Sequence, residues 1–351
     1  MARRSARFCQ KGTWTRKGYD EAMAVLVTGG AGYIGGHMTL GLIDAGEDVV
    51  VLDNLSTGFA WAVPPGAKLV VGDFGDAALV DSLIAAHGVD AIAHFAAKIV
   101  VPESVADPLA YYLNNAAKAR NLLECAVRNG IEHFIFSSTA AVYGTPKTLP
   151  VKEGDDLRPE NPYGESKLMV EQMLKWFDVC HGLRSVALRY FNAAGAALDG
   201  DNGEDPRHVA NLIPLVMKVA TGRAPALRVF GTDYPTKDGT GIRDYIHVLD
   251  LALAHARALD FLAAGQPSDV FNVGTGQGAS VFEVLAAARR ISGEKIPTEI
   301  FDRRPGDPAA VFADNRKARE VLGWSPRYGL EEIIATGWRW HHQHPDGFAG
   351  I

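Results

Sequence analysis

The chain has 351 residues, of which 47% are hydrophobic, so it can bury a substantial core in one large domain or two moderate ones. Its formal net charge of −6 argues against a surface for nucleic acid or for anionic membranes. The three widely spaced cysteines, Cys9, Cys125 and Cys180, suggest neither a disulfide framework nor a cysteine-based metal site, and they fit a reducing compartment such as the cytoplasm. No apolar run is long enough to span a bilayer.

Residues 1–22 differ from the rest of the chain. They are rich in Arg and Lys, and no apolar segment of the kind found in a secretory signal follows them. They could form a transit-like or disordered arm, or Met23 could be the natural start. We favour the second reading, because the first expected strand begins two residues after Met23. We therefore expect residues 1–22 to lie outside the fold and to be dispensable.

A dinucleotide-binding pattern opens the body of the chain. The β-branched run Val25–Thr28 predicts a buried parallel strand, and glycines follow at positions 29, 32 and 35. Gly29 allows a tight turn, Gly32 lets the backbone approach a pyrophosphate, and Gly35 lets helix and strand pack closely. A helix is expected from about Tyr33 to Ala45, with its N-terminus facing the phosphates. A lone glycine pattern could be an ordinary loop, but this one lies between a strand and a helix.

The second expected strand, Asp48–Leu52, ends in an acid. Asp53 lies 21 residues past Gly32, where a carboxylate accepts hydrogen bonds from the adenosine ribose hydroxyls. The same carboxylate would repel a 2′-phosphate, so the sequence favours NAD over NADP. A third strand, Lys68–Gly72, also ends in an acid, Asp73, which could hold the adenine amine.

Strands and helices continue to alternate. Strands are expected at Ala91–His94 and His133–Ser137, with a long helix within Pro108–Asn129 between them. This order predicts a Rossmann-type doubly wound parallel sheet over residues 23–190, with ligands bound past the carboxyl ends of the strands. The pattern loosens over 191–351, which predicts a smaller mixed α/β substrate-binding lobe with some segments returning to the first domain.

A tyrosine and a lysine lie at the start of a further predicted helix. Asn161 is a good N-cap and Pro162 suits the first turn, so the helix should begin there. Tyr163 and Lys167 are four residues apart and share one face of the helix. A neighbouring cation lowers the pKa of a phenol, which makes Tyr163 a candidate general base. This spacing is common by chance, but the dinucleotide pattern favours the catalytic reading.

Several motifs in this order resemble a known family. The three glycines, Phe134–Thr139 and the Tyr163/Lys167 pair resemble the extended short-chain dehydrogenases/reductases. Further segments resemble the UDP-glucose 4-epimerase branch of that family: Leu188–Asn192, Asp233–Thr236, Gly239–Val248 and Arg303–Asp307. The resemblance runs from about Ala24 to the end of the sequence.

The resemblance implies an enzyme, a UDP-glucose 4-epimerase (an isomerase), that interconverts UDP-glucose and UDP-galactose with tightly bound NAD. Tyr163 would take the proton from the sugar O4 while hydride leaves C4, and the 4-keto sugar would turn over and receive the hydride on its other face. Lys167 would hold the nicotinamide ribose, and Thr139 would hydrogen-bond the O4 region. NAD would contact Gly29, Gly32, Tyr33, Ile34, Gly35, Asp53, Asn54, Asp73, Phe74, Phe95, Ala96, Ala97, Lys98, Asn114, Ser137, Tyr163, Lys167 and Tyr190.

The resemblance also implies a UDP-sugar site. Its residues would be Thr139, Tyr163, Phe191, Asn192, Asn211, Leu212, Arg228, Val229, Phe230, Arg243, Arg304, Asp307 and Val311. Arginine suits bidentate phosphate contact. Relatives restricted to plain hexoses often have a bulky tyrosine where this chain has Val311, so we expect UDP-GlcNAc and UDP-GalNAc to be accepted as well. Lys98 lies one position earlier than in the best-known epimerases, which leaves its contact with the cofactor open.

Other readings predict other residues. A nucleotide-sugar 4,6-dehydratase needs an additional acid and base, and its relatives carry a carboxylate pair where this chain has Ala140 and Ala141. A UDP-uronic acid 4-epimerase of the same family stays open as an alternative. A net reductase would favour NADP, against which Asp53 argues, and a non-catalytic module would be expected to lose Tyr163 or Lys167.

Two further expectations concern assembly and metal. The resemblance implies a homodimer built on helices near 108–129 and 162–181. The histidines at 341, 342 and 344 could bind metal, but we expect a frayed polar terminus and no metal site.

Overall fold

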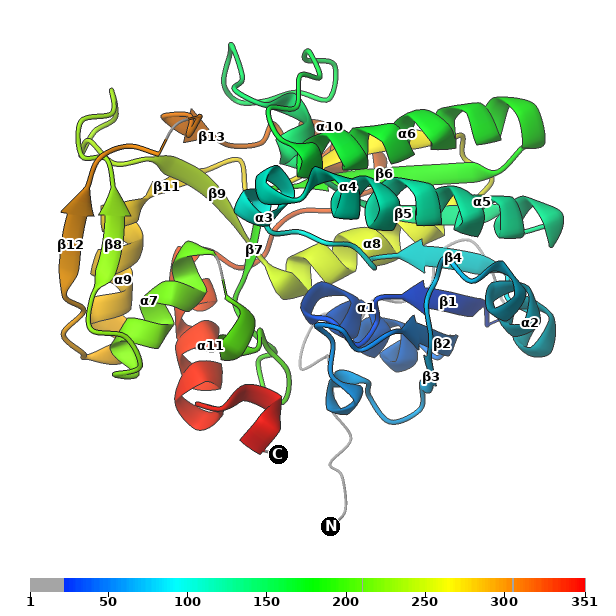
Figure 1. Ribbon diagram of the computed structural model, residues 1–351, viewed down its shortest axis with the longest axis horizontal. Coiled ribbons are helices and arrows are strands. Elements are labelled where there is room, and N and C mark those ends of the chain that lie inside the picture. Colours follow the sequence, from blue (N-terminus) through cyan, green and yellow to red (C-terminus); the bar gives the residue numbers. More distant parts are fainter. Residues whose placement is uncertain (1–21, 210, 305, 351) are drawn as a thin grey trace.

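The computed structural model describes residues 22–209, 211–304 and 306–350, and it places a parallel sheet at the centre of the molecule (Figure 1). The predictions for residues 1–21 lie outside the described residues. The seven strands run in the order β10-β6-β5-β4-β1-β2-β3, and every neighbouring pair is parallel. Their bounds are β1 Ala24–Thr28, β2 Asp48–Asp53, β3 Lys68–Val71, β4 Ala91–His94, β5 His133–Thr139, β6 Arg184–Tyr190 and β10 Asp269–Val273.

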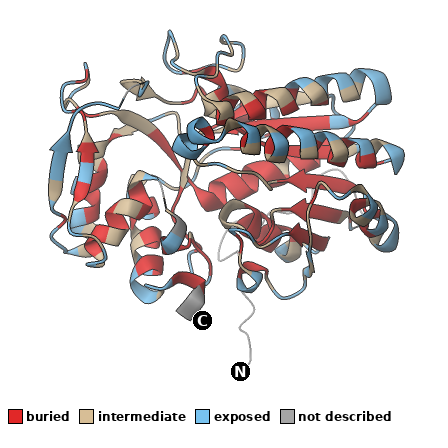
Figure 2. Cartoon of the chain, in the orientation of Figure 1, coloured by how far each residue is buried: buried red, intermediate tan, exposed pale blue. Residues whose placement is uncertain are grey.

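Helices cover both faces of this sheet, as a parallel sheet requires (Figures 1 and 2). Successive side chains of a strand point to opposite faces, so Val27 and Leu26 enter different cores. Val27 packs with α1 and α8 on one face, and Leu26 with α2, α5 and α6 on the other. These helices are α1 Tyr33–Asp44, α2 Ala77–His87, α5 Lys118–Arg128, α6 Pro162–His181 and α8 Val248–Ala263.

Short helical segments complete this part of the molecule. α3 (Val101–Ala106), α4 (Pro108–Tyr111) and the π-helical segment η2 (Tyr112–Ala117) lead into α5 and pack beside α6. The long helix predicted within Pro108–Asn129 is therefore one run with a change of helical type inside it. The 3-10 helices are η1 Ala60–Ala62, η3 Ala140–Tyr143, η4 Pro206–His208 and η5 Gly347–Gly350.

A smaller lobe follows β6 and faces the carboxyl ends of the parallel strands (Figure 1). Its sheets join β9 to β7, β11 and β13, and β8 to β12. Helices α7, α9 and α11 enclose its core with β8. The bounds are β7 Asn192–Ala194, β8 Leu227–Phe230, β9 Ile242–His247, β11 Gly278–Ser280, β12 Thr298–Phe301, β13 Ala310–Val311, α7 Leu212–Ala220, α9 Val281–Ser292 and α11 Leu330–Gln343.

The predicted α/β class with a doubly wound parallel sheet is confirmed. The chain returns to the main sheet after the lobe has begun, because β10 pairs with β6 and α10 (Arg316–Val321) packs against β10. The boundary at about residue 190 stays a prediction.

The expected frayed terminus is wrong. Helix α11 runs to Gln343, Trp340 is fully buried and His341 is buried beside it. Ile333, Ile334 and Trp340 recur at helical spacing and face the interior. The indole N–H of Trp340 also donates to the carbonyl of Glu204 at 2.8 Å, so the end of the chain is held by packing and by a long-range hydrogen bond.

Candidate active site

The turn between β1 and α1 has the backbone geometry that its glycines predict. Gly29 has a φ of +76°, and a Cβ there would lie 2.5 Å from the backbone nitrogen of Ala96. A Cβ on Gly35 would lie 2.3 Å from the carbonyl oxygen of Gly29. Gly32 is the N-cap of α1 and offers no side-chain cap, so its approach is left open for a ligand. The N–H groups of the first turn, at Tyr33 and Ile34, are thus suited to hold a pyrophosphate.

Two acids stand at the ends of neighbouring strands, as predicted. Asp53 closes β2, where its carboxylate accepts from the N–H groups of Ala31 at 3.0 Å and Leu55 at 2.8 Å. The carboxylate therefore ties the glycine turn to the end of β2. Asp73 follows β3 and forms a salt bridge with Lys118. Burial raises the pKa of Asp53, and the two N–H donors oppose that rise.

Three further residues that were expected to contact the cofactor have side chains with different partners. Asn54 caps its own turn through Ser56 N at 3.0 Å. Phe74 is buried in the core with its ring 4.9 Å from that of His94, so its side chain serves packing. Lys98 forms a salt bridge with Glu103 at 3.0 Å, which directs its ammonium along α3.

The loop after β4 is bound to α6 through a residue that the sequence analysis missed. Asn115, buried in η2, accepts from Lys98 N at 2.8 Å and donates to Lys98 O at 2.9 Å. It also lies 3.1 Å from the hydroxyl of Ser166. The predicted neighbour, Asn114, donates to Asn115. In the sequence, only the expected loop after β4 hints at this role, because its backbone N–H and C=O groups need hydrogen-bond partners. That hint does not single out Asn115.

The catalytic candidates meet at the carboxyl end of β5. Helix α6 begins as predicted, with the Asn161 side chain accepting from Gly164 N and Pro162 in the first turn. It places Tyr163 and Lys167, both buried, beside the strand end. The Lys167 ammonium donates to the carbonyl of Ser137 at 2.8 Å. Ser137 also joins Tyr190, with 2.7 Å between the two hydroxyl oxygens.

Thr139 ends β5 on the same side. Its hydroxyl accepts from Ala141 N at 3.1 Å and caps η3. The interaction of that hydroxyl with Tyr163 lowers the pKa of the phenol, whereas burial, the larger effect, raises it. The expectation of a Tyr163 pKa lowered by Lys167 is therefore wrong for the chain by itself, because burial dominates and the ammonium points to Ser137.

A buried ion-pair network, which no sequence pattern indicated, supports these residues. Glu171, one turn beyond Lys167 on α6, forms a salt bridge with Arg189 on β6 at 2.5 Å. Glu171 also accepts from the Ser138 hydroxyl at 2.5 Å. Arg189 donates to the Tyr143 hydroxyl at 2.9 Å. The network fixes α6, the end of β5 and η3 relative to each other.

The predicted UDP-sugar residues lie on the smaller lobe in two groups. In the first, the Arg304 guanidinium lies 3.8 Å from the centre of the Phe230 ring, and Arg228 extends from the same strand, β8, as Phe230. In the second, Arg243 on β9 pairs with Asp307 at 3.5 Å. The lobe thus carries arginines on three of its segments.

Three other members of that set contribute differently. Val229 is 1% exposed, and its side chain lies in the core of the lobe, because alternate residues of β8 point inward. Leu212 packs partly on the same core at the start of α7, and Asn211 is exposed as the N-cap of that helix.

Val311 lies where the lobe meets the catalytic residues. It is on β13 and packs with Phe191 and Ala140 against a small cluster that includes Tyr143. Asn192, on β7, donates to the carbonyl of Asp244 at 3.3 Å. The buried Asp244 carboxylate accepts from the N–H of Ala313 at 3.1 Å and so anchors the segment that carries Val311.

Residues 25–274 match the model of a family described as the NAD dependent epimerase/dehydratase family. The chain belongs to this family. It is 50% identical to a UDP-glucose 4-epimerase of Lacticaseibacillus casei, over 93% of this chain and 99% of that one. It is therefore an enzyme, as predicted, and NAD is its cofactor.

Solved structures agree with this assignment. A UDP-glucose 4-epimerase from Brucella ovis in complex with NAD is 44% identical, with a TM-score of 0.89, over 92% of this chain and 99% of that one. A UDP-glucose 4-epimerase from Bifidobacterium longum in complex with NAD+ and UDP is 41% identical, with a TM-score of 0.88, over 93% of this chain and all of that one.

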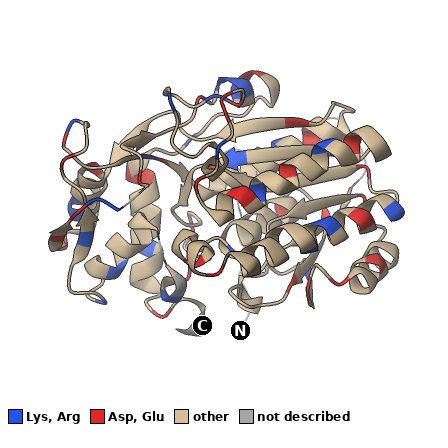
Figure 3. Cartoon of the chain, turned by 45° about the horizontal axis from the view of Figure 1, so that its top comes forward, with Lys and Arg blue, Asp and Glu red and all other residues tan. Residues whose placement is uncertain are grey.

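None of the helices in residues 22–209, 211–304 and 306–350 is long and apolar enough to cross a membrane. The same ranges contain no group of three or more His, Cys, Asp or Glu side chains placed to hold a metal ion. Lys and Arg positions and Asp and Glu positions are interspersed along the chain in Figure 3.

Proposed function

We propose that the protein interconverts UDP-glucose and UDP-galactose by inverting C4, with NAD held throughout the cycle. The observation that carries this proposal is the meeting of Tyr163, Lys167 and Thr139 at the carboxyl end of β5. The glycine turn and Asp53 lie at the ends of β1 and β2 in the same sheet, as a dinucleotide site requires. The similar proteins named above carry the same activity in their names.

In this reaction Tyr163 takes the proton from the sugar O4 and later returns it. The nicotinamide of NAD supplies the hydride acceptor when it is bound. Lys167 orients the nicotinamide ribose, and the Thr139 hydroxyl hydrogen-bonds the O4 region. Arg228, Arg243 and Arg304 would hold the UDP, so the 4-keto sugar can turn over without leaving.

Elimination of water from the sugar would need a further acid and base. The two residues after Thr139 are Ala140 and Ala141, which form the start of η3 and carry no ionisable group. The nearest buried carboxylate on α6, Glu171, is already bound to Arg189 and Ser138. This arrangement favours epimerisation over 4,6-dehydration.

We further propose that N-acetylated sugars are accepted. Val311, Ala140 and Phe191 pack against the same small cluster, and Ala140 follows Thr139 in the chain, which supports a place for Val311 at the side of the sugar. The 2-substituent sweeps a large volume as the sugar turns, and overpacking costs about 1–3 kcal/mol. A valine leaves space that a tyrosine would fill. UDP-GlcNAc and UDP-GalNAc should therefore fit.

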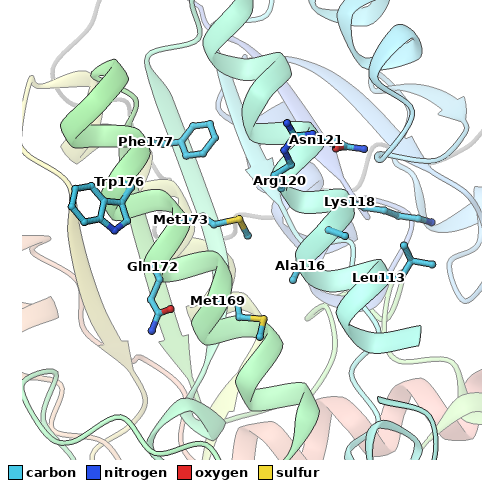
Figure 4. Close-up of a pocket in the computed structure, with 11 residues that line it drawn as sticks. Leu113, Ala116, Lys118, Arg120, Asn121, Met169, Gln172, Met173, Trp176 and Phe177 are labelled. Atoms are coloured by element: carbon cyan, nitrogen blue, oxygen red, sulfur yellow. Dashed lines mark hydrogen bonds between the residues drawn. The ribbon is translucent and has the colours of Figure 1, made fainter. Parts of the chain in front are cut away.

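We also propose a homodimer that buries the groove between α5 and α6. The groove is about 770 Å³ and is lined by Leu113, Ala116, Met169, Met173, Trp176 and Phe177, among others (Figure 4). Trp176 is 64% exposed and Leu109, on α4, is 76% exposed. Large apolar side chains on two adjacent helices suit the same pair of helices on a second copy, which would form a four-helix bundle.

Two further proposals concern the cellular compartment and the domain boundary. We place the reaction in the cytoplasm, because Cys125 and Cys180 are free thiols, which fits a reducing compartment. We divide the chain at about residue 190 into a cofactor domain and a UDP-sugar lobe, with β10 returning to the first.

The deciding experiment is incubation of the purified protein with UDP-galactose, without added NAD, followed by sugar analysis. UDP-glucose should form, and Tyr163→Phe should form almost none. A parallel incubation with UDP-GlcNAc tests the wider specificity. Accumulation of a 4-keto-6-deoxy sugar would overturn the proposal in favour of a dehydratase.

A further inference from the structure

The ammonium group of Lys167 is buried away from bulk water. The residue is 3% exposed. Within the described residues its one hydrogen bond goes to the Ser137 carbonyl. An ammonium has three N–H donors, so this bond alone does not account for how a buried charge is held. Burial lowers the pKa of Lys167 to about 7, and the charge of Glu171 raises it.

A ring lies beneath this ammonium. The Lys167 Nζ atom is 4.9 Å from the centre of the Phe136 ring, within the range of a cation–π interaction. Phe136 is 1% exposed in the middle of β5. The face of an aromatic ring carries partial negative charge and attracts a cation most strongly where water is excluded.

Phe136 is itself held by a histidine. The His94 ring, on β4, stacks on it at 5.9 Å with an interplanar angle of 18°. Its Nδ1 atom lies 2.7 Å from the Thr28 hydroxyl. Burial lowers the pKa of His94 to about 3, so the ring is uncharged and does not repel the ammonium at neutral pH.

The other ionisable groups facing Lys167 do not replace this interaction. Glu171 lies one turn away on α6 and shares its charge with Arg189 on β6. The Tyr190 hydroxyl on β6 is bound to the Ser137 side chain rather than to the ammonium, and burial raises the pKa of the Tyr190 phenol. The ring of Phe136 is therefore the group whose face lies against the Lys167 ammonium.

We propose that Phe136 is a positioning residue: its ring face holds the protonated ammonium of Lys167 in place at the carboxyl end of β5. This inference rests on the proposed cofactor role of Lys167, but it concerns the charge and location of one side chain, which can be measured without turnover.

Phe134 offers a matched control. It lies two residues earlier on β5, is 0% exposed, packs in the same core and also contacts the His94 ring, at 6.1 Å. Phe134→Leu and Phe136→Leu should therefore cost similar packing free energy. They differ in whether the lost ring lies under Lys167.

The test is a pH titration of the purified holoenzyme labelled with 13C at lysine Cε, with Lys167 assigned through Lys167→Arg. Phe136→Leu should move the Lys167 titration about one pH unit lower. Phe134→Leu should leave it close to that of the unchanged protein. Equal titrations in the two variants would overturn the proposal.

A second variant guards against loss of folding. Trifluorophenylalanine at position 136 keeps the shape of the ring and weakens its negative face, so it too should lower the Lys167 titration. An unmoved titration would count against the ring face. NAD retained after gel filtration at pH 6.5, where the lowered titration removes much of the Lys167 charge, should fall in parallel. Absence of UDP-galactose turnover would overturn the proposed function, while the titration would still decide the role of Phe136.

Discussion

Glu171 and Arg189 form a salt bridge of 2.5 Å between α6 and β6, with both side chains almost fully buried. Arg189 contacts both carboxylate oxygens of Glu171, and one of those oxygens also accepts from Ser138. Ser138 precedes Thr139, and Glu171 follows Lys167 by one helical turn. The pair therefore couples the stability of the fold to the placement of the catalytic residues.

Breaking this pair should be costly. Glu171→Gln leaves the Arg189 charge buried without its partner, which costs about 3–5 kcal/mol of unfolding free energy. Urea denaturation measures the change. Glu124→Gln, which breaks the exposed pair of Arg120 and Glu124 on α5, should change the midpoint little. Similar losses in the two variants would contradict the buried role.

Tyr163→Phe should lower kcat for UDP-galactose about 10²- to 10⁴-fold, because it removes the general base. NAD should remain bound, since Lys167 and the glycine turn are unchanged. Lys167→Ala should reduce both turnover and NAD retention. Steady-state kinetics and the absorbance of released NAD separate the two effects. Near-normal turnover in Tyr163→Phe would show that another group is the base.

Val311→Tyr should abolish turnover of UDP-GlcNAc and spare UDP-galactose, because the larger side chain fills the space that the N-acetyl group needs. Val321→Tyr is a suitable control, since Val321 is exposed on α10. Both substrates should be assayed at the same millimolar concentration. If the unchanged enzyme does not turn over UDP-GlcNAc, the specificity proposal is wrong.

Trp176→Glu should convert the dimer to a monomer, because it places a charge in the apolar groove between α5 and α6. Light scattering coupled to gel filtration measures the mass. Trp61→Glu is the control, because Trp61 is a partly exposed tryptophan on η1, outside α5 and α6. It should leave the mass of the dimer unchanged. A dimeric Trp176→Glu variant would place the interface elsewhere.

Acid should destabilise the fold through its buried histidines. Burial lowers the pKa of His255 to about 4, against an unfolded value near 6.5. The unfolded state therefore binds the proton first, so the stability from this group is complete above about pH 6.5 and is lost as the pH falls toward 4. At pH 5 the loss is about 2 kcal/mol. The melting temperature of His255→Gln should depend less steeply on pH between 7 and 5; equal slopes would contradict this account.

Local sequence patterns predicted the strands and the turn that carry the cofactor. The side chains of Val25–Thr28 and of Asp48–Leu52, apart from the exposed Asp48, are buried in the structure, and the N-cap Asn161 marks the start of α6. These features depend on neighbours along the chain, so a pattern a few residues long contains the information.

Features that depend on distant contacts escaped prediction. Nothing around Glu171 indicates Arg189, 18 residues later, as its partner. Asn115 is distinguished from Asn114 by contacts with Lys98, 17 residues away, and with Ser166, 51 residues away. The direction of the Tyr163 pKa was also missed, because burial is a property of the folded molecule rather than of the Tyr163/Lys167 spacing.

The place of β10 in the sheet has a consequence for biosynthesis. Strand β6 ends at Tyr190, but its outer partner β10 ends at Val273, so 83 further residues must leave the ribosome before that edge is covered. Until then, the growing polypeptide exposes a row of unpaired backbone donors and acceptors beside a nearly finished cofactor fold. A pause in translation within this interval would lengthen the time in which chaperones, or other nascent chains, can bind there.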